Sequence, residues 1–341
     1  MMTPPPASNA DPLSALRAAL SAVCSGSPGA ALAALAAAGH DRLPLPGHGA
    51  TLTRWRALAA VGAHDLSLAK LFEGHTDALA ILAEAGAPAD SAAGLWAAWC
   101  AEPPDARLLL APRGGGFALR GRKAWCSGAR DVSHAVVSCW SPDGEALLAA
   151  VDLRQGGVAI TDDGWHAVGM AASASVDVTF DDVAATPLRG PGFYVERAGF
   201  WHGGAGVAAC WFGAATRLAD VLRARLAQRA DPHRLAQLGQ VAVALQASAA
   251  LLREAAAAID AAPGADAMAL ALSVRLHIEA SATAALQAFG RALGAGPLCK
   301  DPALARLYAD LPVFLRQSHA ERDQEAVGRL LASEGAAPWT L

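Results

Sequence analysis

Cysteine is scarce in this sequence, and none of it is arranged as a motif. The six cysteines are spread over 341 residues without a Cys-x-x-Cys pair or a local cluster. A disulfide framework or a zinc site needs such spacing, so the pattern is typical of a reduced, cytoplasmic protein. The signatures His-Glu-x-x-His, Gly-x-Ser-x-Gly and the Walker glycine loop are also absent. Metal-dependent hydrolysis, serine hydrolysis and nucleoside triphosphate chemistry therefore have no sequence support.

Charge of one sign is nowhere concentrated, and long apolar runs are missing. The 27 basic and 31 acidic residues are mixed along the chain and give a net charge of -4. Nucleic acid is not an expected partner, because binding its phosphates requires a clustered basic face. No uninterrupted apolar run reaches the roughly 18 to 20 residues that span a bilayer, and the Pro-rich start lacks the pattern of a signal peptide. We expect a soluble protein without a membrane partner.

Two helical regions flank a central region of different character. Residues 11–94 are rich in Ala and Leu with Gly and Pro breaks, which predicts several short helices. Residues 95–190 contain runs typical of strands, at 135–140 and 176–180, between Gly-rich and Asp-rich turns. Residues 191–335 return to helical texture. The sequence predicts an α+β fold with an N-terminal helical domain, a central antiparallel β domain and a C-terminal four-helix bundle.

The last region predicts long helices at about 198–228, 265–292 and 302–333. Between the first two, apolar residues recur at alternating spacings of three and four, as on one face of a further helix. This stripe consists of Leu235, Leu238, Ala242, Leu245, Ala249 and Leu252.

A short string in the central region has a more specific pattern. Residues 119–129 read Leu-Arg-Gly-Arg-Lys-Ala-Trp-Cys-Ser-Gly-Ala. Together with the helix-strand-helix order, this string resembles the acyl-CoA dehydrogenase superfamily, whose Gly-x-Lys-x-Trp-Ile-Thr/Ser segment lies against a flavin ring. The resemblance implies bound FAD, with Trp125 as a flat apolar surface and Ser127 as a hydrogen-bond donor. The alternative is that Trp125 is an ordinary core aromatic.

Other strings extend this resemblance over most of the chain. Trp99-Cys100-Ala101, followed by Glu-Pro, is similar to a family stretch whose backbone reaches the flavin pyrimidine ring. Because Ala101 replaces a hydroxyl residue, only main-chain contacts are expected there. Residues 168–173 and 180–183 resemble the family's Gly-Met-Arg-x-Ser segment and its closing strand.

The resemblance also implies a cofactor shared between subunits. Gly294 and Gly296 resemble the glycine loop that receives the FAD diphosphate and adenosine of a neighbouring subunit, although a plain helix C-cap uses the same glycines. Arg234 lies one position from the family's arginine in Arg-x-x-Phe-Gly. FAD would then sit at a subunit interface, which implies a homodimer or homotetramer.

The family's catalytic carboxylate is missing. Removing the α-proton of an acyl thioester needs a Glu beside the flavin. Counting from Asp310 places Ser318 at that position, and the family's other location for the base corresponds to about Gly203. The sequence therefore identifies a divergent member that lacks the usual Glu.

Three interpretations remain for the function. The main one is an FAD-dependent dehydrogenase of an acyl-CoA or acyl-carrier thioester, in which Glu321 reaches the flavin and an electron-transfer flavoprotein or oxygen accepts the electrons. The second is a flavin monooxygenase of the same fold, with Ser318, His319 and Ser127 as donors. The third is a catalytically inactive partner subunit. For His319, a solvated helix histidine is the alternative to a catalytic role.

Overall fold

Short capped helices begin the chain. The structure, a computed structural model, describes residues 11–23, 26–88, 92–228 and 231–333. The helices before the sheet are α1 (Pro12–Ala22), α2 (Pro28–Ala37), α3 (Thr51–His64) and α4 (Leu66–Ala85). The side chain of Asp65 caps α4 by accepting from Leu68 N at 2.8 Å, and Gly86 ends this helix with φ +76°. The predicted N-terminal helices are confirmed.

The central strands form a closed sheet. They are β1 (Trp96–Trp99), β2 (Leu108–Arg113), β3 (Gly116–Cys126), β4 (His134–Trp140), β5 (Ala146–Asp152), β6 (Val158–Ile160) and β7 (Val176–Pro187). The pairing order is β1-β4-β2-β3-β7-β5, and a further pairing of β4 with β5 closes the ring into a barrel. Most pairs are antiparallel as predicted, but β1 and β2 each run parallel to β4.

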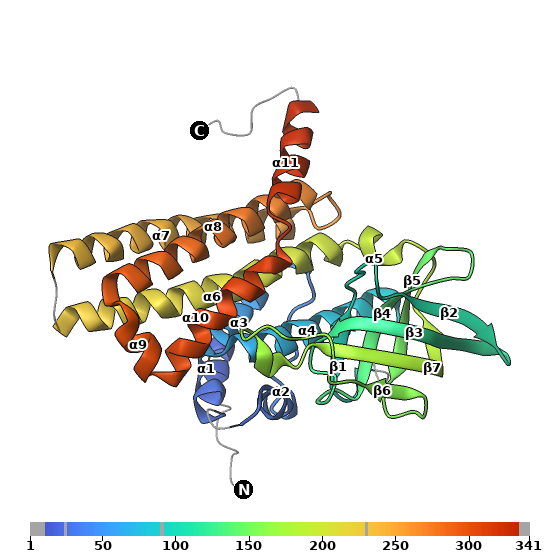
Figure 1. Cartoon of the computed structure of the whole chain (residues 1–341). Helices are drawn as coiled ribbons and strands as arrows, with labels where there is room; N and C mark the ends of the chain where they lie inside the picture. Colours follow the sequence, from blue (N-terminus) through green and yellow to red (C-terminus); the bar gives the residue numbers. More distant parts are fainter. Residues whose placement is uncertain (1–10, 24–25, 89–91, 229–230, 334–341) are drawn as a thin grey trace, which may run out of the picture.

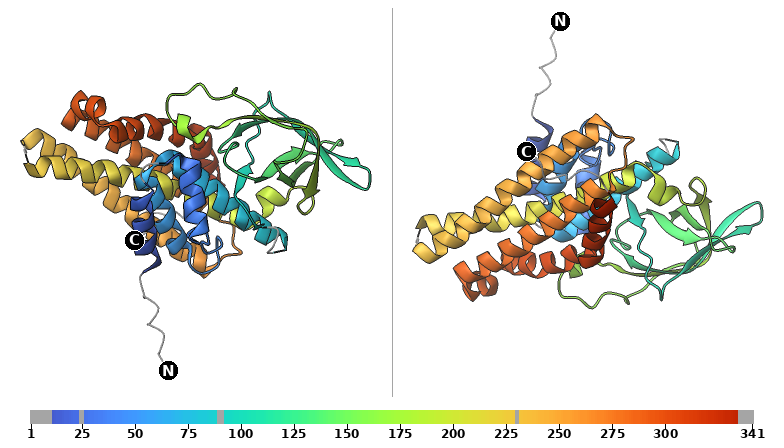
Figure 2. Two further views of the ribbon diagram at one scale, coloured as in Figure 1. Left: turned by 90° about the horizontal axis from the view of Figure 1, so that it is seen from below. Right: turned by 90° about the horizontal axis from the view of Figure 1, so that it is seen from above.

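The described residues after the barrel are mostly helical. They are α5 (Phe193–Glu196), α6 (Gly199–Gln228), α7 (Pro232–Ala261), α8 (Met268–Leu293), α9 (Ala295–Lys300), α10 (Pro302–Phe314) and α11 (Glu321–Ser333). Single-turn helices η2 (Ala171–Ser173) and η3 (Leu315–Gln317) lie before β7 and after α10. Barrel and bundle lie at opposite ends of the molecule, with α4 where they meet (Figures 1 and 2).

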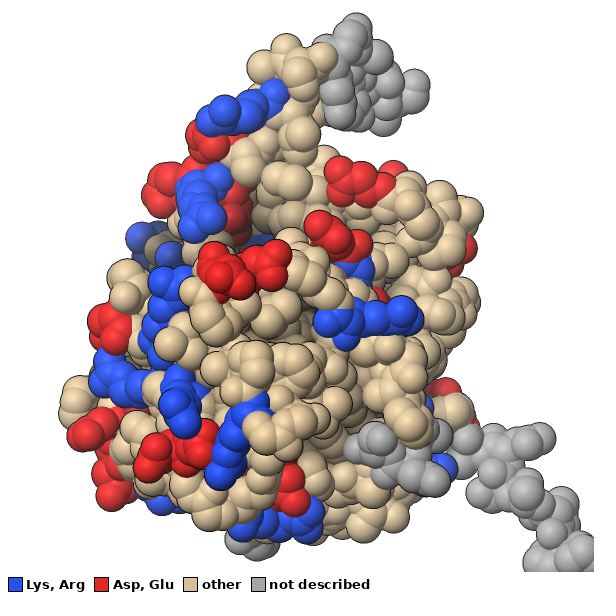
Figure 3. Space-filling model, turned by 90° about the vertical axis from the view of Figure 1, so that its right-hand side faces the viewer, with Lys and Arg blue, Asp and Glu red and all other residues tan. Residues whose placement is uncertain are grey.

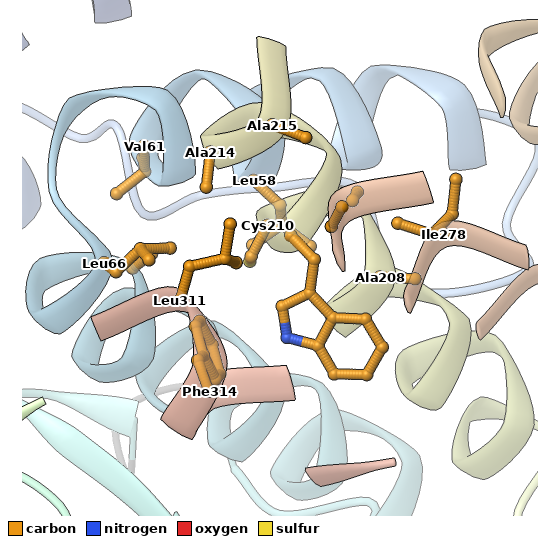
Figure 4. Close-up of a cluster of buried hydrophobic side chains, with 14 of the residues drawn as sticks. Leu58, Val61, Leu66, Ala208, Cys210, Ala214, Ala215, Ile278, Leu311 and Phe314 are labelled. Carbon is orange, nitrogen blue, oxygen red and sulfur yellow. The ribbon is translucent and has the colours of Figure 1, made fainter. Parts of the chain in front are cut away.

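The helical core forms around α6. A Cβ atom at Gly213 would lie 2.0 Å from Ala59 O, so this glycine lets α6 approach the α3 backbone closely. Figure 4 shows Val61 of α3, Ala208 of α6 and Phe314 of α10 converging in one apolar cluster. The core therefore fastens α10 to both the N-terminal and the C-terminal helices.

The predicted helix at 302–333 is wrong in one respect, because it is two helices. The chain leaves the helical conformation at Ser318, which has ψ 139°, and Ala320 adopts φ +45°. Asp323 then accepts from His319 N at 3.1 Å at the start of α11. The break places Ser318 and His319 in a turn between α10 and α11.

The stripe predicted along α7 is only partly buried. Leu252 is 5% exposed, but Leu235 is 48% exposed and Val243 between them is 69% exposed. Among the described helices, α6 and α7 are both apolar enough to cross a membrane by length and composition alone, although the sequence contains no uninterrupted apolar run of that length. The apolar window of α6 is 61% buried in the molecule, whereas that of α7 is 17% buried. Thus α6 is a core helix, and α7 presents an uncovered apolar surface.

Candidate functional site

Trp125 lies outside the barrel, on a distorted part of β3. The β3–β7 register shifts between Lys123 and Cys126, and Trp125 at this bulge has φ +56°. Positive φ is strained for a bulky side chain, and such strain is concentrated at functional sites. The indole is 50% exposed, so the interpretation of Trp125 as a core aromatic is wrong.

Ser127 is held two residues further along. Its residue exposure is 8%, and the indole Nε1 of the buried Trp99 donates to Ser127 O at 3.0 Å. Gly128 N donates to Ser173 O at 2.8 Å, which ties the end of β3 to η2. Trp99 thus positions the Ser127 backbone from inside the barrel.

A small cavity opens between α4 and the barrel beside Ser127. Its volume is about 10 Å³, room for about one water molecule, and α4 contributes Lys70, Leu71 and Gly74 to its wall. Trp99 and Ser127 line the opposite side. Lys70 Nζ pairs with Glu73 at 2.5 Å, so an ion pair of α4 stands next to this cavity.

Cys100 and Ala101 follow β1 in the segment that leads to β2. Burial raises the pKa of the Cys100 thiol to about 11, so this cysteine is protonated at neutral pH. Next to Ala101, Glu102 accepts from the buried Lys123 Nζ at 2.5 Å, and Lys123 also donates to Ser138 O at 2.9 Å. The segment is thereby fixed to β3 and β4.

The turn between α10 and α11 holds the predicted catalytic residues. Ser318 is 4% exposed, whereas the His319 side chain is 63% exposed and its Nδ1 lies 3.5 Å from Asp323 Oδ1. Glu321 is exposed at the first position of α11. Arg275 of α8 holds the turn in place through two hydrogen bonds to backbone carbonyls. Its Nη2 donates to Gln317 O at 2.6 Å, and its Nη1 donates to Gly204 O at 2.7 Å.

One segment joins this turn to Ser127. Asp310 Oδ1 accepts from Met170 N at 2.5 Å, and a Cβ atom at Gly169 would lie 2.2 Å from Ala309 O, so α10 packs closely on residues 169–170. Residues 171–173 then form η2, which is bonded to Gly128 as described above. Ser127 and the helix before His319 are therefore fastened to the same short segment.

The remaining predicted residues lie elsewhere. Arg234 pairs with Asp231 at the start of α7, Gly294 is the C-cap of α8, and Gly296 lies within α9. This end of the bundle is far from the barrel (Figure 1). Within one chain, these residues cannot meet Trp125, so only a neighbouring chain could bring the two groups together.

Two further observations concern the surface. A hollow of about 410 Å³ lies between α8 and α10, with Tyr308 and Arg316 among its lining residues, but it includes none of the predicted site residues. Figure 3 shows basic and acidic side chains interspersed on the face that it presents, without a large patch of one sign. Within the described residues, no cluster of His, Cys, Asp and Glu could hold a metal ion.

Several groups around the site were missed at the level of sequence. Arg275 and Asp310 act through contacts between segments that are distant in sequence, which a local pattern cannot predict. Asp323 contacts His319 only four residues away, so its spacing was visible in the sequence. Ser173 and Ser175 come together because Ala174 between them adopts φ +43° at the end of η2, a turn that the sequence does not mark.

Comparisons with known proteins agree on the architecture. No protein-family description and no curated protein matches the sequence. Among solved structures, KijD3 in complex with FMN and dTDP-3-amino-2,3,6-trideoxy-4-keto-3-methyl-D-glucose has a TM-score of 0.81 at 22% identity, covering 96% of this chain and 94% of that one. The chain has the acyl-CoA dehydrogenase-like fold. This confirms the predicted order of helical, β and helical parts.

Two other structures are similar over their whole length. The methanesulfinate monooxygenase MsuC from Pseudomonas fluorescens has a TM-score of 0.81 at 22% identity, covering 96% of this chain and 99% of that one. TdsC from Paenibacillus sp. A11-2, in complex with FMN and indole, has a TM-score of 0.79 at 18% identity, covering 96% and 97%. At such identities the likeness lies in the fold.

Proposed function

We propose that the chain is a flavin-dependent oxidoreductase, and that it works as a monooxygenase using FMN. The observation that supports this most is Trp125, an aromatic face held at φ +56° and left 50% exposed beside the buried Ser127. An isoalloxazine ring needs a flat apolar surface on one face and a hydrogen-bonding group at its edge. The strained backbone at Trp125 keeps its indole out of the core, as a surface for the flavin ring requires.

The residues that would hold the flavin follow from this geometry. Trp125 would cover one ring face, and the Ser127 hydroxyl, backed by Trp99, would bond the ring edge. When bound, the flavin would supply two-electron redox chemistry and, in its reduced form, reactivity towards dioxygen. Among the chain's own groups, we propose His319 to hold or move a proton at Nδ1, supported by Asp323 Oδ1 at 3.5 Å.

The same arrangement argues against thioester dehydrogenation, the main interpretation from sequence. Ser318 is a buried hydroxyl where the resemblance calls for a carboxylate, and Gly203 has no side chain to offer. Glu321 begins α11 on the exposed side of the turn. Two of the similar structures, TdsC and MsuC, are described as monooxygenases, which supports the alternative.

We infer FMN in place of the FAD expected from the resemblance. Within one described chain, Arg234, Gly294 and Gly296 lie at the end of the bundle far from the barrel, as they would if they received the adenosine of a neighbouring subunit's FAD. Their placement therefore does not choose between the two flavins, and the support for FMN comes from the similar structures. FMN is the flavin in the TdsC and KijD3 complexes.

Flavin binding is tested by titrating the protein with FMN and FAD and following flavin fluorescence. We expect FMN to bind, and Trp125→Ala to weaken binding by about tenfold or more, as loss of an aromatic stacking partner does. Phe117→Ala is the matched control, because Phe117 is an aromatic of the same strand with 41% exposure. Equal weakening by both variants would contradict the assignment.

The reaction class is tested by an anaerobic titration of the flavin-loaded protein with saturated acyl-CoAs. A monooxygenase without a base should leave the oxidised flavin band unchanged. Bleaching of that band by any acyl-CoA, and its loss in Glu321→Gln, would instead support the dehydrogenase. A monooxygenase should instead take up oxygen after its flavin has been reduced chemically.

A further inference from the structure

Three buried serine hydroxyls form a chain that ends at Ser127. Ser127 Oγ and Ser175 Oγ are 2.7 Å apart, and Ser175 Oγ and Ser173 Oγ are 2.8 Å apart. Ser173 Oγ donates to Met170 O at 2.7 Å. The three residues are 8%, 3% and 1% exposed in the order Ser127, Ser175, Ser173. Each hydroxyl therefore depends on its neighbours for hydrogen bonds.

The direction of these bonds follows from counting protons. A hydroxyl has one proton to donate, and a carbonyl oxygen can only accept. Because Ser173 donates to Met170 O, it must accept from Ser175. Ser175 has then donated its proton and must accept from Ser127. In this arrangement the Ser127 hydroxyl has only lone pairs left to offer a ligand.

The three serine hydroxyls can also donate in the opposite direction, at the cost of one hydrogen bond. If Ser127 donates outward, Ser175 must donate to Ser127 and Ser173 to Ser175. Met170 O then loses the Ser173 hydroxyl but keeps the backbone bond from Ser173 N at 3.0 Å. The reversed chain has one hydrogen bond fewer and leaves no carbonyl unpaired.

We propose that Ser173 and Ser175 are positioning residues that set the hydrogen-bonding polarity of Ser127 and so favour a reduced flavin. This rests on the proposed flavin site. The flavin N5 atom accepts a hydrogen bond when oxidised and donates one as N5–H when reduced. A Ser127 hydroxyl that offers lone pairs matches the reduced ring directly, whereas the oxidised ring requires the chain to reverse.

The size of the preference for reduced flavin follows from the one hydrogen bond, from Ser173 Oγ to Met170 O, that is lost when the serine hydroxyls reverse. A neutral hydrogen bond contributes a factor of about three to ten to an equilibrium constant. The protein should therefore bind reduced flavin about threefold to tenfold more tightly than a site with an unbiased hydroxyl. For a two-electron couple this corresponds to a midpoint potential about 15 to 30 mV higher.

Substitutions along the chain predict an ordered series. Ser173→Ala removes the acceptor of the Ser175 proton, so Ser175 donates to Ser127 and the preference is lost or inverted. Ser175→Ala frees Ser127 to rotate, so the preference is lost but not inverted. In a Ser127→Ala background, Ser173→Ala should change nothing. Ser248→Ala is the matched control, since Ser248 is a buried serine of α7 bonded to Ala244 O.

The experiment is an equilibrium reductive titration of the FMN-loaded proteins against a reference dye, with Kd for oxidised FMN measured separately. We expect the midpoint potential to fall in Ser173→Ala, to fall less in Ser175→Ala and to stay at the wild-type value in Ser248→Ala. Thermal unfolding of each variant checks that the fold is retained.

The outcomes separate the two proposals. If wild type and variants bind FMN with the same potential, the serine chain has no such role and the flavin site stands. If Ser173→Ala raises the potential, the deduced direction of the chain is wrong. If the wild type binds neither FMN nor FAD, the proposed function fails and this inference fails with it.

Discussion

Replacing Asp310 by asparagine tests how the segment behind Ser127 is held. Asp310 is 3% exposed in α10, and its carboxylate accepts from Met170 N at 2.5 Å. Burial raises the pKa of this carboxyl from 3.8 to about 6, despite the opposing effect of the bond from Met170. The folded protein therefore binds this proton more tightly than the unfolded chain does.

The sign and size of the effect follow from that difference. Stability from the protonated carboxyl is fully present below about pH 4 and is lost as the pH rises through about 6. The gap between 3.8 and about 6 corresponds to about 3 kcal/mol, at 1.36 kcal/mol for each pH unit. Asparagine keeps an oxygen that can accept from Met170 N and does not ionise. Because pH 4 lies slightly above the unfolded pKa, the wild type should therefore lose about 2.4 kcal/mol relative to Asp310→Asn between pH 4 and pH 7.

Urea unfolding followed by circular dichroism at pH 4, 5, 6 and 7 measures this difference. Subtracting the variant removes groups that titrate in both proteins, such as His202, whose pKa is lowered by burial. Asp220→Asn is the control, because Asp220 is a surface residue with a side chain 64% exposed. A wild-type minus Asp310→Asn difference that stays constant, or that grows in favour of the wild type with pH, would refute the reasoning.

Two further predictions concern other parts of the molecule. Arg275→Leu removes the donors to Gly204 O and Gln317 O. We expect the free energy of unfolding in urea to fall by about 2 to 4 kcal/mol and the α10–α11 turn to be cleaved faster by a protease. An unchanged rate of cleavage would contradict the role of Arg275 in holding this turn. The homo-oligomer implied by the resemblance stays a prediction, and the uncovered surface of α7 is where we expect a second copy to bind. Val243→Glu or Leu235→Glu should then reduce the mass found by light scattering to that of one chain, while a wild-type monomer would contradict this.

Much of the fold was predictable because its signals are local. Gly and Pro breaks, strand-like runs and helical periodicity gave the order of helical, β and helical parts. The break at Ser318 was missed because residues 316–325 contain neither Gly nor Pro, although the apolar stripe of α10 stops at Leu315. The parallel pairing of β1 with β4 was missed because it joins strands that are distant in sequence.

The candidate site was predictable only where a motif marks it. Trp125 and Ser127 were found through their string, although the strained φ of Trp125 depends on the bulge that β7 imposes on β3. Arg275 was missed because it reaches the 317–320 turn from a segment distant in sequence. Asp323 was missed although it lies only four residues after His319, because its role depends on the turn at Ser318. The roles predicted for Ser318, His319 and Glu321 stay predictions.

Adding FMN to the purified protein tests most directly whether Trp125 and Ser127 form a flavin site. We expect saturable binding of FMN, a rise in the unfolding temperature with FMN, and weaker binding in Trp125→Ala than in Phe117→Ala. Protein that shows neither flavin absorbance nor thermal stabilisation with excess FMN or FAD would contradict this assignment.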